Sequence, residues 1–119
     1  MPTTFTPILQ RAIERVPGAL GVLFAAQDGE EVDHVGAIAG HDVRIVGAHY
    51  GILLALAKEA LVRLGLGETE HMSFHHGDLT VFVRVVGDGY YLMLAGSGFP
   101  AHAARELDAL AAALRTEIG

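Results

Sequence analysis

The sequence predicts an α/β (α+β) domain built on a five-stranded antiparallel sheet, with its elements in the order α-β-β-α-β-β-β-α. Short glycine-containing turns join successive apolar segments, and strands connected so closely run antiparallel. A continuous apolar run at 19–26 is typical of a strand that is covered on both faces. A long apolar stretch between 42 and 65 has the length of a helix that could cover such a sheet. We expect one domain over residues 1–119.

The first predicted elements are a short helix and the apolar strand. Thr6 is expected to cap the helix, with Pro7 at the first helical position. Apolar side chains recur at helical spacing as far as Val16, and Pro17-Gly18 ends the helix. The strand at 19–26 follows directly.

A weaker strand follows a tight turn at Asp28-Gly29. It covers 31–39 and mixes glycine and polar residues with apolar ones. That composition is typical of a strand at the edge of a sheet.

The rest of the chain predicts a long helix, three strands and a last helix. Asp42 is expected to cap the long helix, and the glycines within 65–67 close it. Further strands are predicted at 69–76, 79–86 and 90–95. The last helix follows 96–100 and places these residues on one apolar face: Ala103, Ala104, Leu107, Leu110, Ala111 and Leu114.

The long helix is more apolar than its own sheet requires. At 100° per residue, its apolar side chains fill an arc of roughly 200°, against a little over 100° for an ordinary surface helix. The centre of the arc consists of Val46, Leu53, Ala60 and Leu64. One flank consists of Tyr50, Leu54 and Leu61, and the other of Ile45, Ile52 and Leu56. Gly47 and Gly51 leave room for a neighbouring backbone. The surplus predicts a homodimer interface on this helix.

Composition excludes several classes of function. A net charge of −6 with eight scattered basic residues argues against nucleic-acid binding, which depends on neutralising phosphates. The chain lacks cysteine, so it has neither disulfides nor thiolate metal sites. Charged residues interrupt its most apolar stretch, which predicts no membrane span. The N-terminus does not resemble a signal peptide, and we expect a cytoplasmic protein.

No residue pattern predicts catalysis, a cofactor or a metal. His71 and His75 would lie about 13 Å apart on one face of a strand, too far to share a zinc ion, and His76 faces the other side. The serines, Ser73 and Ser97, lack the spacing of a nucleophile elbow. The arginines fall mostly on predicted helix surfaces, where solvation explains them: Arg11, Arg15, Arg44, Arg63, Arg105 and Arg115.

The stretch VPGALGVLFAAQDGE at 16–30, with the long apolar helix, three strands and final amphipathic helix, resembles the roadblock/dynein light chain family over essentially the whole chain. The resemblance implies the strand order 2-1-5-4-3, with one long helix on one face and two helices on the other. It also implies a dimer in which second strands pair edge to edge and long helices pack side by side. Family members include dynein light chains, scaffolds for Rag-type GTPases and bacterial partners of Ras-like GTPases in polarity or motility. The abundance of alanine, glycine and arginine favours a bacterial origin.

The expected function is therefore a non-enzymatic, homodimeric module that binds and regulates or scaffolds a Ras-like small GTPase. Any stimulation of GTP hydrolysis is expected to be indirect, without an inserted arginine. The expected dimer interface consists of Val32, His34, Val35, Ile45, His49, Ile52 and Leu56.

An alternative is a profilin-like or PAS-like sensor that holds a small molecule between sheet and helix. In that case, glycines and alanines of the long helix would line the pocket. Its polar groups would come from Tyr50, Tyr90 and Tyr91.

Overall fold

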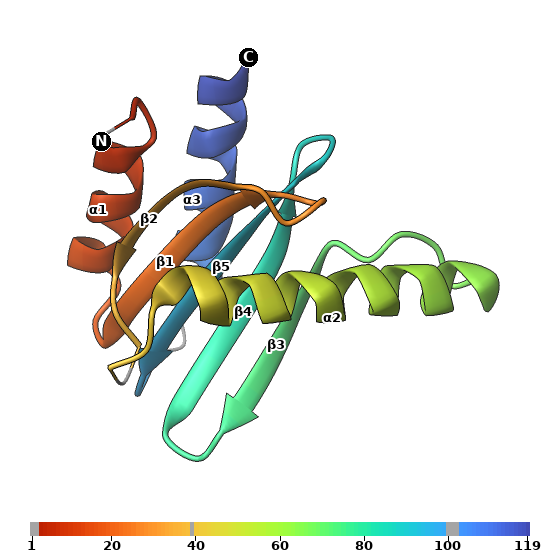
Figure 1. Cartoon of the computed structure of the whole chain (residues 1–119), viewed down its shortest axis with the longest axis horizontal. Coiled ribbons are helices and arrows are strands. Elements are labelled where there is room, and N and C mark those ends of the chain that lie inside the picture. Colours follow the sequence, from red (N-terminus) through yellow and green to blue (C-terminus); the bar gives the residue numbers. More distant parts are fainter. Residues whose placement is uncertain (1–2, 39, 100–102) are drawn as a thin grey trace.

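The computed structural model describes residues 3–38, 40–99 and 103–119, and it confirms the predicted order of elements. The elements are α1 (Thr6–Arg15), β1 (Ala19–Ala26), β2 (Glu31–Gly36), α2 (Val43–Arg63), β3 (His71–His76), β4 (Leu79–Val86), β5 (Tyr90–Ser97) and α3 (Ala103–Ile118). The strands form one antiparallel sheet in the order β2-β1-β5-β4-β3, as the resemblance implied. Helix α2 crosses one face, and α1 and α3 cover the other (Figure 1).

Strand β1 is buried on both faces, which explains its continuous apolar sequence. Val22 and Phe24 belong to the core beneath α1 and α3. Leu23 and Ala25 belong to the second core, beneath α2. Because successive side chains of a strand point to opposite faces, both sets must be apolar.

Several predicted boundaries differ from the structure. Strand β2 ends at Gly36 rather than at 39, because the chain turns there into an isolated bridge between Ile38 and His41; Ala39 lies outside the described residues. Strand β3 begins at His71 rather than at 69. Strand β5 extends to Ser97 rather than 95, because Ser97 still pairs with Leu79.

The predicted cap of α1 is wrong. Thr6 is already the first helical residue, and Phe5 occupies the N-cap position without a side-chain hydrogen bond. The Thr6 hydroxyl instead donates to the carboxylate of Asp33 on β2. The threonine therefore ties α1 to the edge strand rather than capping its own helix.

The break between α1 and β1 depends on glycine. Gly18 has φ +86°, and a Cβ atom there would lie 1.9 Å from the carbonyl oxygen of Ser97. The backbone N–H of Ser97 donates to the Gly18 carbonyl at 2.9 Å. Both the backbone conformation and this close approach require a residue without a side chain.

Candidate functional site: the exposed flank of α2 and the edge strand β2

Helix α2 begins at a capped end beside the edge strand. The Asp42 carboxylate accepts from the backbone N–H of Arg44 at 2.9 Å, as the predicted N-cap requires. Hydrogen bonds from the Arg44 guanidinium and backbone lower the pKa of Asp42 to about 2. Helix α2 contacts β2 near this end, as Figure 1 shows. The start of the helix therefore lies close to β2.

Two glycines determine how closely α2 packs on the sheet. A Cβ at Gly47 would lie 2.2 Å from Cδ2 of Leu23, and one at Gly51 would lie 2.4 Å from the hydroxyl of Tyr91. The Tyr91 hydroxyl donates to the carbonyl of Gly47 at 3.0 Å. The predicted close approach is present, but it is made by side chains of the sheet rather than by a neighbouring backbone.

A second contact fixes α2 to β3, the edge strand of the sheet opposite to β2. The hydroxyl of Tyr50 is hydrogen-bonded to Nε2 of His76 at 2.7 Å, and the ring of Tyr50 packs edge-on against Phe74. Burial raises the pKa of Tyr50, and also that of Tyr91. Both hydroxyls are thus neutral at physiological pH and engaged in bonds within the chain. The sensor alternative would instead require these hydroxyls to bond a ligand.

The buried side of α2 is not the predicted centre of its apolar arc. Leu54 is buried, and Tyr50 and Leu61 on the same flank are half-buried. Leu53, at the predicted centre, is exposed. The sheet therefore covers one flank of the arc rather than its middle, which leaves the opposite flank wholly free.

That free flank contains the helix residues expected at the interface. Ile45, Ile52 and Leu56 are 61%, 59% and 59% exposed. His49 is exposed between them, and its Nδ1 is hydrogen-bonded to the carbonyl of Ile45 at 2.8 Å. These four residues lie on one face of α2, so the structure brings the helix part of the expected set together.

The three edge-strand residues of that set do not share one face. His34 pairs with Leu23 and lies on the same side of the sheet as α2. Val32 and Val35 pack against the core on the side of α1 and α3. Their side chains are therefore on the opposite side of the sheet from the free flank. Of the three, only His34 lies on the side of the sheet where a contact could also include the flank.

Asp33 organises the edge strand. Its carboxylate accepts from the hydroxyls of Thr3 and Thr6 and, at 2.8 Å, from the backbone N–H of His34. Partial burial raises the pKa of Asp33, but these hydrogen bonds together lower it by more than burial raises it. The net shift is therefore downward. The ring of His34 is in turn bonded to Glu31. The strand is thus polar at its surface and tied to α1.

The exposed apolar surface of α2 continues past the flank to the residues that follow the helix. Leu64 and Leu66 are each 71% exposed, and Val62 is also exposed. In Figure 1 the C-terminal half of α2 extends beyond the sheet on the side of β3. The periodicity of the sequence placed Leu64 in the apolar arc, but it did not show that the sheet leaves Leu64 uncovered.

By length and composition, α2 would also suit a membrane-spanning helix. It has 21 residues and a mean hydropathy of 1.5 over its most apolar 18-residue window. Insertion would break the hydrogen bonds of Tyr50 and Tyr91 and remove Leu54 from the core. The absence of a membrane span stays a prediction.

The three histidines of β3 do not share one face of the strand. His71 and His75 are on the face of β3 opposite to Met72 and Phe74, whereas His76 faces Tyr50. Within residues 3–38, 40–99 and 103–119, no group of three histidine, aspartate or glutamate residues is placed to bind a metal ion. His102 lies outside this part of the chain.

No protein-family model and no curated protein matches this sequence. Solved structures match it closely in shape. A Roadblock/LC7 domain from Streptomyces avermitilis superposes with a TM-score of 0.84 at 19% identity, over 93% of this chain and 94% of that one. MglB of Myxococcus xanthus gives 0.84 at 13% identity, over 98% of both chains. The gliding protein MglB of Thermus thermophilus gives 0.80 at 14%, over 92% of this chain and 84% of that one.

The chain therefore has the roadblock/LC7 fold, which confirms the resemblance seen in the sequence. Its structural neighbours include MglB of Myxococcus xanthus and the gliding protein MglB of Thermus thermophilus.

Proposed function

We propose that this protein is a non-enzymatic roadblock module that forms a homodimer in the cytoplasm and binds a Ras-like small GTPase, which it regulates or scaffolds. The free flank of α2 carries this proposal. It presents Ile45, Ile52 and Leu56, each about three-fifths exposed, on a helix whose other side is already packed on the sheet. Contiguous apolar surface of this kind is typical of protein–protein interfaces.

A two-fold axis beside β2 would use both halves of the site. The start of α2 lies next to β2, so helices from two protomers can meet when the two β2 strands approach each other. Such an isologous contact buries the same patch on both partners. It also covers the backbone of an edge strand, which otherwise invites unspecific pairing.

The MglB neighbours and the family resemblance support the GTPase as partner. The two arginines of α2 are paired within the chain: Arg44 with Asp42 at 2.8 Å and Arg63 with Glu59 at 2.6 Å. We propose that any effect on hydrolysis acts by reshaping the switch loops of the GTPase, without an inserted arginine. Single Arg→Ala variants should leave stimulation intact wherever they leave binding intact.

The sensor alternative has less support. Leu23 lies against Gly47 and Tyr91 against Gly51. The open hollow lined by Ala48, Gly51 and Ala55 contains none of the three tyrosines that were expected in a pocket. Tyr90, the third tyrosine expected in a pocket, stacks on Phe24 on the other side of the sheet.

Light scattering across a hundredfold dilution tests the dimer. We expect a constant mass of about 25 kDa, twice the 12.6 kDa of the chain. A mass of 12.6 kDa at every concentration would contradict the homodimer.

The GTPase is tested separately by biolayer interferometry. Each Ras-like GTPase of the source genome is immobilised with GDP or with a nonhydrolysable GTP analogue. We expect one of them to bind in a nucleotide-dependent way. Failure of all of them in both nucleotide states would overturn the partner but leave the dimer standing.

A further inference from the structure

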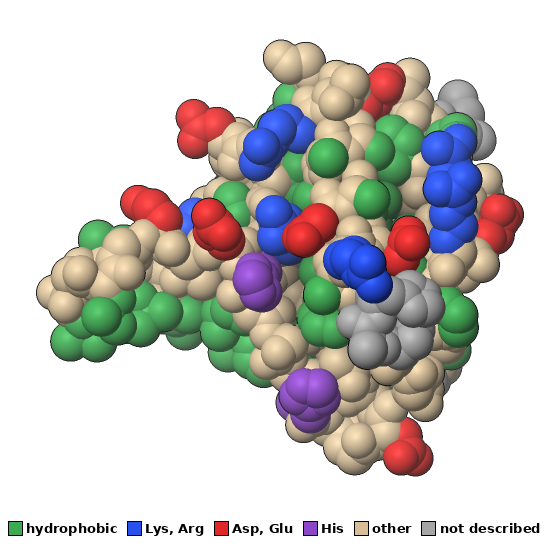
Figure 2. Space-filling model, turned by 180° about the vertical axis from the view of Figure 1, so that it is seen from behind, with side chains coloured by type: hydrophobic (Ala, Val, Ile, Leu, Met, Phe, Trp, Pro, Cys, Tyr) green, Lys and Arg blue, Asp and Glu red, His purple; other side chains and the backbone are tan. Residues whose placement is uncertain are grey.

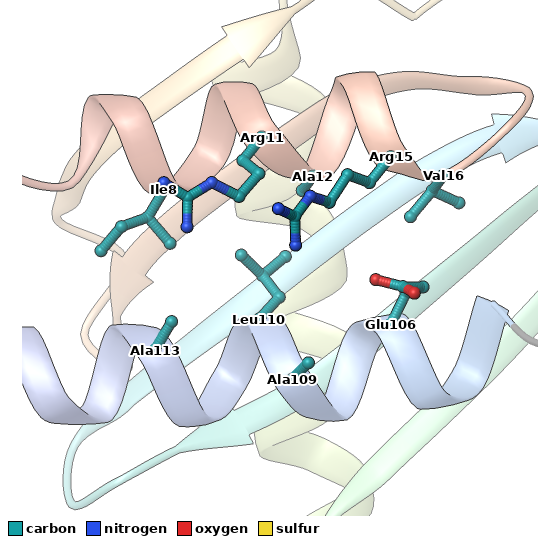
Figure 3. A pocket seen from close by; sticks show the side chains of 9 residues that line it. All are labelled: Ile8, Arg11, Ala12, Arg15, Val16, Glu106, Ala109, Leu110 and Ala113. Atoms are coloured by element: carbon teal, nitrogen blue, oxygen red, sulfur yellow. The ribbon is translucent and has the colours of Figure 1, made fainter.

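A groove runs between α1 and α3, on the side of the sheet away from α2 (Figure 3). Its open volume is about 420 Å³. The floor is apolar and consists of Leu110, Ala109 and Ala113 from α3 with Ile8 and Ala12 from α1. Figure 2 shows this face of the molecule, with hydrophobic surface between rows of charged side chains. The free flank of α2 lies on the opposite face, so the groove stays accessible in the proposed dimer.

Small side chains on α3 create the hollow. Ala109 and Ala113 lie one turn apart and face α1, where larger residues would close the space. Leu110 and Ala12 are nearly buried beneath them, so the two helices are already packed together at depth. The groove is therefore a surface depression above a core that is already closed.

Two guanidinium groups overhang this floor. Arg11 and Arg15 are one helical turn apart on α1, and both side chains point over the groove toward α3 (Figure 3). Among the described residues, neither forms an ion pair with a carboxylate. Glu106 is the single acidic residue in the lining, at one end. In a chain with a net charge of −6, these two arginines form a local positive site over an apolar floor.

We propose that this groove binds a segment of a partner protein that carries two carboxylates, one helical turn apart, beside an apolar side chain. The carboxylates would accept from Arg11 and Arg15, whose planar guanidinium groups suit paired hydrogen bonds to carboxylate oxygens. The apolar side chain would lie on Ala109, Ala113 and Leu110. Residues i and i+4 of a helix are about 6 Å apart along its axis, which matches the spacing of the two arginines.

The chemistry selects a protein segment over a small anion. The groove is open and shallow, and its floor offers a free carboxylate ion only apolar contacts. Exposed ion pairs are individually weak, so the affinity must come from apolar and charged contacts made together. Binding should therefore weaken as salt is added.

The test uses a probe peptide built of Leu-Glu-Ala-Ala repeats and capped at both ends. Its leucines and its glutamates form adjacent stripes at i, i+4 spacing. Backbone amide chemical shifts of the full chain are followed during titration. We expect shifts confined to α1 and α3, and at least tenfold weaker binding of the matching peptide with Gln in place of Glu.

Charge-reversed variants distinguish binding in the groove from attraction to the overall charge of the protein. R11E/R15E should weaken binding at least tenfold, whereas R105E/R115E, with the same change of charge outside the groove, should change it little. R11Q/R15Q provides a neutral second variant if the charge reversal disturbs α1. Equal binding of the Gln peptide, equal weakening by both charge-reversed pairs, or shifts outside α1 and α3 would each overturn the proposal.

Light scattering on R11E/R15E tests whether a second copy of this chain occupies the groove instead. If this variant alone lowered the oligomeric mass of the free protein, the groove would hold a second copy of this chain, and the proposed partner segment would be wrong. An unchanged mass supports a separate partner. Neither result depends on the GTPase experiment, so the two proposals can fail independently.

Discussion

Replacing Ile52 by aspartate tests the free flank of α2 directly. Ile52 lies in the middle of the flank and is 59% exposed. Full burial of such a side chain is worth about 1.5–3 kcal/mol, so covering the remaining three-fifths is worth about 1–2 kcal/mol. A symmetric dimer contains two copies, which doubles this to about 2–4 kcal/mol. At about 1.4 kcal/mol for each factor of ten, the dissociation constant should rise about 30- to 700-fold.

The introduced charge adds to this effect, because an aspartate buried at an interface without a partner must give up its hydration. In the free protomer the same substitution lies on the surface and should change stability by no more than about 0.5 kcal/mol. Thermal unfolding therefore separates loss of assembly from loss of folding.

Sedimentation equilibrium over a range of concentrations measures the change. The matched control is I118D, since Ile118 is 38% exposed on α3, on the other face of the sheet. We expect I52D to dissociate at much higher concentrations than the native chain does and I118D to behave like the native chain. The reasoning would be refuted if I52D associated as tightly as the native protein, or if I118D dissociated equally.

Three further predictions concern stability. Gly18→Ala combines a positive φ with a Cβ 1.9 Å from the Ser97 carbonyl oxygen, whereas Gly29→Ala has a similar φ of +96° and open space. In chemical denaturation, Gly18→Ala should lower the free energy of unfolding by about 2–5 kcal/mol and Gly29→Ala by about 1–2 kcal/mol. Equal losses would contradict the close approach. Tyr91→Phe removes the buried hydroxyl that donates to the Gly47 carbonyl and should cost about 0.5–1.5 kcal/mol, seen as a lower melting temperature; an unchanged melting temperature would argue against this hydrogen bond. The pKa of Asp33 is lowered from 3.8, so its stabilising effect is complete above that pH and is lost as the pH falls through the folded-state pKa. Asp33→Ala should therefore be less stable than the native chain at neutral pH, with the gap closing as the pH drops below about 4; a gap independent of pH would exclude this linkage.

Much of the fold could be predicted from local patterns. The continuous apolar run of β1, the Asp28-Gly29 turn and the Pro17-Gly18 break each have one physical explanation. Boundaries were less certain, because they depend on pairing with distant strands. Thr6 illustrates the same limit. Its hydroxyl donates to Asp33 on the edge strand, 27 residues away, and no local rule for helix caps includes that partner.

The candidate site was only partly predictable. The width of the apolar arc on α2 indicated a surplus, but it did not show which flank the sheet covers. That choice depends on where Leu23 and Tyr91 meet Gly47 and Gly51, which is set by the packing of a sheet assembled from separate segments. The sequence also did not show which way the side chains of the edge strand point. Val32 and Val35 lie on the face of the sheet opposite to the flank.

The sequence by itself thus determined the order of elements, the antiparallel sheet and the excess of apolar surface on one helix. These follow from the period of side chains along a single segment and from turns of a few residues. Only the tertiary structure decided which side of α2 remains free, which arginines lack a partner and where a groove forms. Those properties belong to pairs of elements distant in the chain, and their packing is fixed only when the whole core closes.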